Sequence, residues 1–245
     1  MRVISCVPSI SELAEELRPG CLVGRTRFCI APDSIRQLPK IGGTKDLDTA
    51  AIIRLKPDLV LAVKEENEKK QIGELMSAGI ETAVFDIRTL EDARAMVQEC
   101  GKLLQNPAQA NRIAAEMNKI REPAPGNRGS MLYFIWQKPW MVAGADTFIG
   151  DLLAKSGFRN LAPEGARYPV IEDIAQIRQL NPDFIFLSDE PFPFREKHRA
   201  AFQNNFPLSR VLCVDGSIFS WYGSRTARLK QYLQNLPGLN ECFDK

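Results

Sequence analysis

A strand-sized apolar run that follows the same turn occurs twice in this chain, 125 residues apart. Residues Leu55–Ala62 read LKPDLVLA, and residues Leu180–Leu187 read LNPDFIFL. A proline after an amphipathic helix and before an apolar run is typical of the junction between a helix and a buried strand. Two further pairs match in the same order: an apolar-Asp junction before a helix, and a helix closed by glycine. The repeat therefore predicts two similar lobes in sequence.

Short apolar runs alternate with helix-period segments throughout the first half. The alternation predicts strands at 3–7, 22–24, 58–63 and 82–85 and helices at 9–17, 47–55, 68–77 and 90–104. Ser9 or Ser11 is a suitable N-cap for the first helix, and Pro19-Gly20 ends it. This order is typical of α/β units around a parallel sheet.

One amphipathic segment separates the two halves. Asn106 is a suitable N-cap with Pro107 at the first helical position, and Ile113, Met117 and Ile120 share one face. The predicted fold is α/β, with two Rossmann-like α/β lobes joined by one long backbone helix. The corresponding domains are an N-terminal lobe at 1–105, a bridging helix at 106–122 and a C-terminal lobe at 123–245.

Composition and missing motifs exclude several function classes. Thirty-two Lys and Arg residues against 30 Asp and Glu give a net charge of +2, too little for binding nucleic acid through charge. No apolar run reaches the roughly 20 residues of a membrane-spanning helix. His198 is the single histidine, which disfavours a zinc site that needs several histidines. The G-x-S-x-G motif of serine hydrolases is absent. Gly42–Lys45 resembles a phosphate loop but reads better as a turn entering a helix. We expect no catalytic residue, no metal ligand and no intrinsic cofactor, so the chain is not predicted to be an enzyme.

Cysteine usage and the chain start bear on the compartment. The six cysteines contain no C-x-x-C pair, which predicts reduced thiols without disulfides. The chain begins on a predicted core strand without a basic and apolar leader, which favours a cytoplasmic protein as the sequence stands. A periplasmic or cell-surface location follows if a signal has been removed. We expect a monomer.

Aromatic residues and arginines gather in loops that follow predicted strands. All three tryptophans lie in such loops beside proline or glycine, and arginines at 25, 27, 167 and 225 accompany the rings. Loops at the carboxyl ends of strands are where open α/β sheets bind ligands. The predicted ligand-binding residues are Arg25, Arg27, Phe28, Lys64, Glu65, Trp136, Trp140, Arg167, Tyr168, Glu190, Phe192, Phe194, Trp221, Tyr222 and Arg225.

Five segments together resemble a known family. They are VPSISE at 7–12, VGR at 23–25, GGTK at 42–45, LKPDLVLA at 55–62 and SWYGSR at 220–225. Residues 2–236 are similar to periplasmic binding protein-like, substrate-binding proteins of ABC transporters. The most similar branch is the helical backbone metal receptors, which take up corrinoids such as vitamin B12 (cobalamin), ferric siderophores for iron transport, and haem.

The resemblance implies a shallow ligand cleft between the lobes. Phe28, Trp221 with Tyr222, and the stretch 137–141 match cleft positions of the B12 binders. Val63 stands where those proteins have a cleft tryptophan. The family docks on a permease through an acidic residue on each lobe. Candidates in the first lobe are Glu65, Glu66, Glu68 and Glu74, and no clear acid lies near 223–225.

These observations lead to a primary hypothesis and two alternatives. The chain captures a preformed metal chelate for an ABC importer, with a corrinoid first and a ferric siderophore or haem second. The arginines favour an anionic siderophore, whereas the family branch favours a corrinoid. One alternative is a cytosolic chelate carrier or sensor without a permease. The other is a chelatase or nitrogenase-type assembly enzyme, which the single histidine disfavours.

Overall fold

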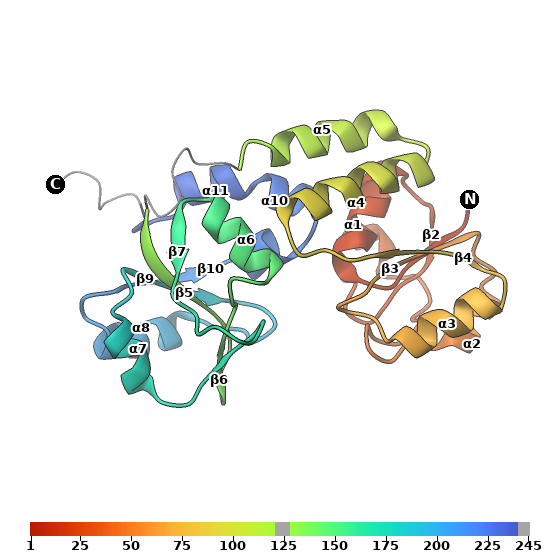
Figure 1. The fold of residues 1–245 in the computed structure, drawn as a ribbon. Helices are drawn as coiled ribbons and strands as arrows, with labels where there is room; N and C mark the ends of the chain where they lie inside the picture. The colour runs from red at the N-terminus through yellow and green to blue at the C-terminus, as the bar shows by residue number, and fades with distance from the viewer. Residues whose placement is uncertain (121–127, 240–245) are drawn as a thin grey trace. The chain divides into compact units, whose positions relative to one another are not determined.

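The computed structural model describes residues 1–120 and 128–239, which form two compact units (Figure 1). The first unit contains Met1–Ile87, Glu91–Ala115 and Trp221–Ser224. The second contains Arg88–Leu90, Glu116–Ser220 and the described residues from Arg225 onward. Each unit is built around its own sheet, and each is described by itself below.

The elements of the N-terminal half follow the predicted alternation of strand and helix. They are β1 (Val3–Ser5), α1 (Pro8–Leu17), β2 (Leu22–Gly24), a 3-10 turn (Asp33–Ile35), α2 (Thr49–Arg54), β3 (Leu59–Val63), α3 (Lys69–Ser77), β4 (Glu81–Phe85), α4 (Leu90–Leu103) and α5 (Pro107–Met117).

The first sheet has the order β2-β1-β3-β4, and all of its pairs are parallel. Helices α2 and α3 lie on one side of it, and α1 and α4 lie on the other (Figure 1). On the α2–α3 side, Ile4, Val60 and Ala62 pack in one core cluster with Ile52 and Leu75. Because both faces are covered, β3 is buried along its whole length, which explains its uninterrupted apolar sequence.

The elements of the C-terminal half form a second, larger sheet with its own helices. They are β5 (Gly129–Trp136), β6 (Trp140–Val142), α6 (Phe148–Lys155), β7 (Phe158–Asn160), β8 (Val170–Ile171), α7 (Ile174–Leu180), β9 (Phe184–Ser188), α8 (Glu196–Asn205), β10 (Arg210–Val214), α9 (Gly216–Ser220), α10 (Ser224–Ala227) and α11 (Leu229–Asn235).

The second sheet has the order β10-β9-β5-β6-β8, with β7 paired to β5. Strands β10, β9, β5 and β7 are mutually parallel, whereas β6 runs antiparallel to both β5 and β8. One face packs Phe134, Ile185 and Leu187 against Ile177 of α7 and Phe202 of α8. The other face is aromatic, because its ring contacts join Tyr133, Phe158, Phe184, Phe186 and Phe219.

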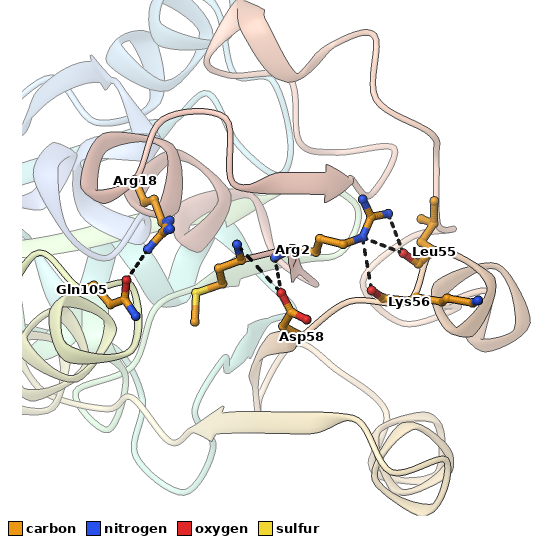
Figure 2. Close-up of polar contacts among 7 residues, drawn as sticks. Arg2, Arg18, Leu55, Lys56, Asp58 and Gln105 are labelled. Carbon is orange, nitrogen blue, oxygen red and sulfur yellow. Dashed lines mark hydrogen bonds and ion pairs between the residues drawn. The ribbon is translucent and has the colours of Figure 1, made fainter.

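The repeated Pro-Asp motif performs the same structural task in both units. Lys56 and Asn181 hold equivalent left-handed conformations, with φ of 47° and 45°. Two residues later, Asp58 accepts a 2.6 Å hydrogen bond from the Arg2 main-chain nitrogen (Figure 2). In the second unit, Asp183 accepts 2.6 Å bonds from both the main-chain nitrogen and the hydroxyl of Ser130. The motif therefore fixes each central strand pair at the amino-terminal edge of its sheet.

The Arg2 side chain reinforces this edge of the first unit. Its guanidinium donates to the main-chain carbonyls of Leu55 and Lys56, at 2.7–3.2 Å (Figure 2). The bonds of Arg2 use carbonyls that the end of α2 leaves without intrahelical partners. The same figure shows Arg18, the residue after α1, donating to the Gln105 side-chain oxygen at 2.8 Å.

The predicted α/β class with two sheet-centred lobes is confirmed, and two details of the prediction are wrong. Helix α1 begins at Pro8 after Val7, so neither predicted serine caps it, and the Ser11 hydroxyl donates back to the Val7 carbonyl at 3.0 Å. The sequence also predicts one helix over 225–236, and the structure divides this segment into α10 and α11.

The bridging helix and the domain boundaries stay a prediction. Asn106 caps α5 through a 3.3 Å bond from the Gln109 main-chain nitrogen, as expected. The helix ends at Met117, and the contact grouping changes from the first unit to the second after Ala115. Residues 121 and 122 of the predicted bridge lie outside the described residues.

We expect Asp183→Asn to lower the free energy of unfolding by about 1 kcal/mol at neutral pH, after allowance for solvent screening. The bonds from Ser130 hold the pKa of the Asp183 carboxyl below its usual range. A depressed pKa stabilises the fold above the unfolded pKa, and that contribution is lost as the pH falls through the folded pKa.

Urea denaturation at neutral pH and below about pH 4 checks this. The difference between Asp183→Asn and the wild type should shrink in acid. The exposed Asp146→Asn variant is the control and should show no such difference. An Asp183→Asn deficit that is equal at both pH values would contradict the expectation.

Candidate functional site

The carboxyl-terminal edge of the first sheet brings together two segments that the sequence singled out and a third, at Asp86, that it did not. Residues 25–28 follow β2, Lys64 and Glu65 follow β3, and Asp86 follows β4. Because the strands are parallel, these segments leave the sheet at the same edge. The predicted grouping of residues 25–28 with 64–65 therefore corresponds to a real feature of this unit.

Arg25 lies beneath this edge rather than on it. Its side chain is buried, with 9% of the residue exposed. The guanidinium donates to the main-chain carbonyls of Thr26, Cys29 and Arg36 at 2.9–3.3 Å. It therefore ties together the loop that carries Phe28, whose ring is 52% exposed.

Asn67 joins three segments of the same edge and was not among the predicted site residues. Its amide oxygen accepts from the Val63 main-chain nitrogen at 2.8 Å, and its amide nitrogen donates to the carbonyls of Cys6 and Thr44. The residue is 5% exposed. The sequence left open whether 64–67 lies at the cleft edge or forms a capped, solvated turn, and only the spatial neighbours show that its last residue is buried.

The remaining charges of this edge are largely neutralised within the unit. Arg27 pairs with Asp46 at 2.5 Å and lies over the Phe28 ring, 5.3 Å from its centroid. Lys64 pairs with Asp86 at 2.8 Å. The Glu65 carbonyl accepts from the Lys45 ammonium at 2.7 Å. These pairs are exposed, so they orient side chains more than they stabilise the fold.

The carboxyl edge of the second sheet presents an aromatic pair. Trp136 ends β5 with 38% of its surface exposed, and its ring meets the half-buried Phe192 ring edge to face at 5.8 Å. Phe192 lies in the loop after β9, the neighbouring parallel strand. Glu190 of that loop accepts a 2.5 Å hydrogen bond from the Ser220 hydroxyl of α9, which fixes the loop beside the pair.

Two of the predicted rings belong to the core of the second unit. Phe194 is 2% exposed and packs in the cluster under α7 and α8. Trp140 is half-buried and meets Phe134 and Phe202 edge to face, at 6.0 and 4.9 Å. Both rings support the edge from below, so the surface available to a ligand there is that of Trp136 and Phe192.

Arg167 and Tyr168 lie away from that edge. The main-chain nitrogens of Val142 and Gly144, at and beyond the end of β6, donate to the carbonyls of Pro169 and Arg167. Since β6 runs antiparallel to β5, its end lies toward the amino-terminal edge of the sheet. The Arg167 guanidinium donates to the Asp146 carbonyl at 2.9 Å. Sequence reasoning missed this because it expected a loop after a parallel strand.

The segment 220–225 does not directly follow β10, because the short helix α9 intervenes. Trp221 is half-buried and Tyr222 is 6% exposed, and both group with the first unit. Gly223 has a φ of +104° and lies against Leu13 of α1. Arg225 donates to the Ser217 hydroxyl at 2.7 Å. Trp221 is therefore separated from β10 by α9 and groups with the first unit, and its contact with a ligand stays a prediction.

The charged run 195–199 predicts that His198 lies on a solvated helix face, whereas the residue is half-buried in the structure. Its ring lies 5.5 Å from the Phe192 ring and 5.6 Å from the Phe194 ring. Its Nδ1 accepts from the Arg195 main-chain nitrogen at 2.9 Å and forms part of the N-terminal cap of α8. A main-chain N–H can only donate, so the neutral imidazole carries its proton on Nε2. In that form Nε2 has no lone pair for a metal.

Residues 1–120 and 128–239 contain no group of three His, Cys, Asp or Glu side chains that could hold a metal ion. Within those ranges, no helix has the length and apolar character needed to cross a membrane. Cys6, Cys21, Cys29, Cys100 and Cys213 are free thiols. Burial raises the pKa of Cys6, Cys21 and Cys100 to about 12, and Cys242 lies outside the described residues.

Comparison with known proteins identifies the family. The sequence model of the periplasmic binding proteins matches residues 3–210. The chain belongs to this family. A curated vitamin B12-binding protein of Pectobacterium carotovorum is 25% identical over 199 residues, which are 78% of this chain and 72% of that protein.

Solved structures support the same fold. The periplasmic vitamin B12 binding protein of Vibrio cholerae has a TM-score of 0.78 at 19% identity, with 94% of each chain covered. The periplasmic haem-binding protein of the same organism has a TM-score of 0.77 at 19% identity, covering 96% of this chain and 97% of that one. This member of the periplasmic binding protein family is a binding protein rather than an enzyme, which excludes the chelatase alternative.

We expect the stability of this binding protein to fall between about pH 7.5 and about pH 5.5 because of His198. Burial, then the charges of Lys197 and Arg195, hold the pKa of His198 below its usual range. Unfolding therefore becomes linked to proton uptake as the pH falls through the unfolded pKa. In His198→Gln this part of the pH dependence should disappear, as urea denaturation at both pH values would measure. An unchanged dependence would contradict the assignment.

Proposed function

We propose that this binding protein captures a preformed metal chelate and delivers it to an ABC importer, with a corrinoid as the first candidate. The observation that carries the proposal is the exposed aromatic surface at the carboxyl edges of the sheets, where α/β folds bind ligands. Phe28 is 52% exposed in the first unit, and Trp136 is 38% exposed beside Phe192 in the second. Large rings left in solvent at such an edge suit a bulky ligand with flat or apolar parts.

The state of the arginines favours a corrinoid over an anionic siderophore. Arg25 is satisfied by main-chain carbonyls, and Arg27 is paired with Asp46. Arg167 and Arg225 donate to a carbonyl and a hydroxyl of their own unit. An anionic ligand would compete with these partners, whereas a largely neutral chelate needs mainly apolar contact. The vitamin B12-binding relative supports the same order, and the haem-binding structural neighbour keeps haem as a second candidate.

Location and partner follow from the proposal. Delivery to an importer requires a periplasmic or cell-surface protein, and Glu65, Glu66, Glu68 and Glu74 are the proposed permease contacts of the first unit. A cytoplasmic location would instead make the chain a chelate carrier or sensor. Monomeric binding without a resident cofactor remains part of the proposal.

We expect Trp136→Ala to weaken binding of cyanocobalamin by about 10- to 50-fold. Covering the exposed part of the ring would bury ~100 Å² of apolar surface, worth about 2.5 kcal/mol before the entropic cost of binding is subtracted. Phe28→Ala and Trp221→Ala should each weaken binding by about 10-fold or more. Isothermal titration with cyanocobalamin and with hemin gives the dissociation constants.

Leu208→Ala is the matched control. Leu208 is an 84% exposed apolar residue of the second unit, but it precedes β10 and so lies toward the amino-terminal edge of the sheet. Its removal should change affinity by less than about twofold. Ring variants with the same affinity as Leu208→Ala would contradict the proposed binding surface.

A further inference from the structure

Arg25 is a buried cation whose hydrogen-bond acceptors, among the described residues, are all main-chain carbonyls. A buried charge without a carboxylate partner is costly unless several well-aligned dipoles surround it. The three carbonyls are those of Thr26, Cys29 and Arg36. They belong to one loop, so the guanidinium spans the beginning, the middle and the far end of that loop.

The loop from Thr26 to Arg36 makes one main-chain bond to another described segment, from the Arg27 nitrogen to the Gly42 carbonyl at 2.8 Å. The main-chain bonds within it are short-range: Cys29 to Thr26, Ile35 to Pro32 and Arg36 to Asp33. Its other anchors are the ion pair of Arg27 with Asp46 and the buried side chains of Thr26, Cys29 and Ile35. Most of these hold the beginning of the loop. Among the described residues, the Arg25 guanidinium is the one side chain that bonds to carbonyls at both ends of the loop, Thr26 and Arg36.

The outer part of the loop carries exposed apolar side chains. Phe28 and Ile30 are 52% and 56% exposed, and they flank Cys29, whose carbonyl Arg25 holds. An exposed ring that is already fixed in place binds a ligand more tightly than one that must be ordered on binding. The bonds made by Arg25 thus bear directly on how Phe28 meets a ligand.

We propose that Arg25 is a positioning residue for ligand binding, which acts by holding the 26–36 loop so that Phe28 is presented in a fixed orientation. It does not contact the ligand, although its sequence position beside an aromatic predicts a contact. This inference rests on the proposed function, because it requires Phe28 to contact the bound chelate.

Arg25→Lys is the informative substitution, since it keeps the charge but loses the planar fork that reaches several carbonyls. The matched control is Arg54→Lys, an exposed position at the end of α2 in the same unit. Hydrogen exchange followed by mass spectrometry reports loop order through the amides of Cys29, Ile35 and Arg36. The amides of β3 report the rest of the unit.

The expected result has three parts. Arg25→Lys accelerates exchange in the loop by about 10-fold or more while leaving β3 unchanged. It weakens binding of cyanocobalamin, or of hemin if only that probe binds, by about 5- to 20-fold. In a Phe28→Ala background the same substitution costs less than about twofold, because the ring it positions is gone.

Other results overturn the inference in distinguishable ways. An equal affinity loss with and without Phe28 would make Arg25 a direct ligand contact or a general structural residue. Faster loop exchange with unchanged affinity, while the wild type binds the probe, would contradict the positioning role alone. A wild type that bound neither probe would contradict the proposed function, and the positioning role would fall with it.

Discussion

Parallel pairing of short buried strands determines where the functional surface of each unit can lie. In the first sheet every pair is parallel, and in the second β10, β9 and β5 are parallel. Every such strand therefore delivers its following loop to the same edge, and the exposed rings of Phe28 and Trp136 are found there. At the opposite edge the repeated Pro-Asp turn ties the central strands together, which separates structural from functional loops.

The polar groups at the carboxyl edges of the two sheets mostly form hydrogen bonds and ion pairs within the protein. The Asn67 amide forms hydrogen bonds with three segments, and the Arg25 guanidinium donates hydrogen bonds to the carbonyls of one loop. Leaving a buried polar group unsatisfied costs about 1–3 kcal/mol, so these residues are committed to their internal partners. The surface that remains for a ligand consists chiefly of exposed aromatic rings. The charged side chains around these rings are already paired with one another.

The sequence predicted the elements well because strand-sized apolar runs and helix periodicity are local signals. It also predicted the repeat, since Leu55–Ala62 and Leu180–Leu187 carry the same turn chemistry. It failed where direction or a tertiary partner decides the outcome. The antiparallel β6 directs Arg167 and Tyr168 away from the carboxyl edge, and α9 separates Trp221 from the end of β10. Local pattern cannot show that Phe194 is buried while the nearby Phe192 is not.

Native mass spectrometry of the purified protein tests the central claim of chelate capture most directly. The protein is mixed separately with cyanocobalamin, cobinamide, hemin and a ferric siderophore, and with free Co²⁺, free Fe³⁺ and metal-free protoporphyrin. The account predicts retention of an intact chelate, with the corrinoids retained best and the free ions not retained. An unchanged protein mass with every chelate, or retention of the free ions alone, would contradict it.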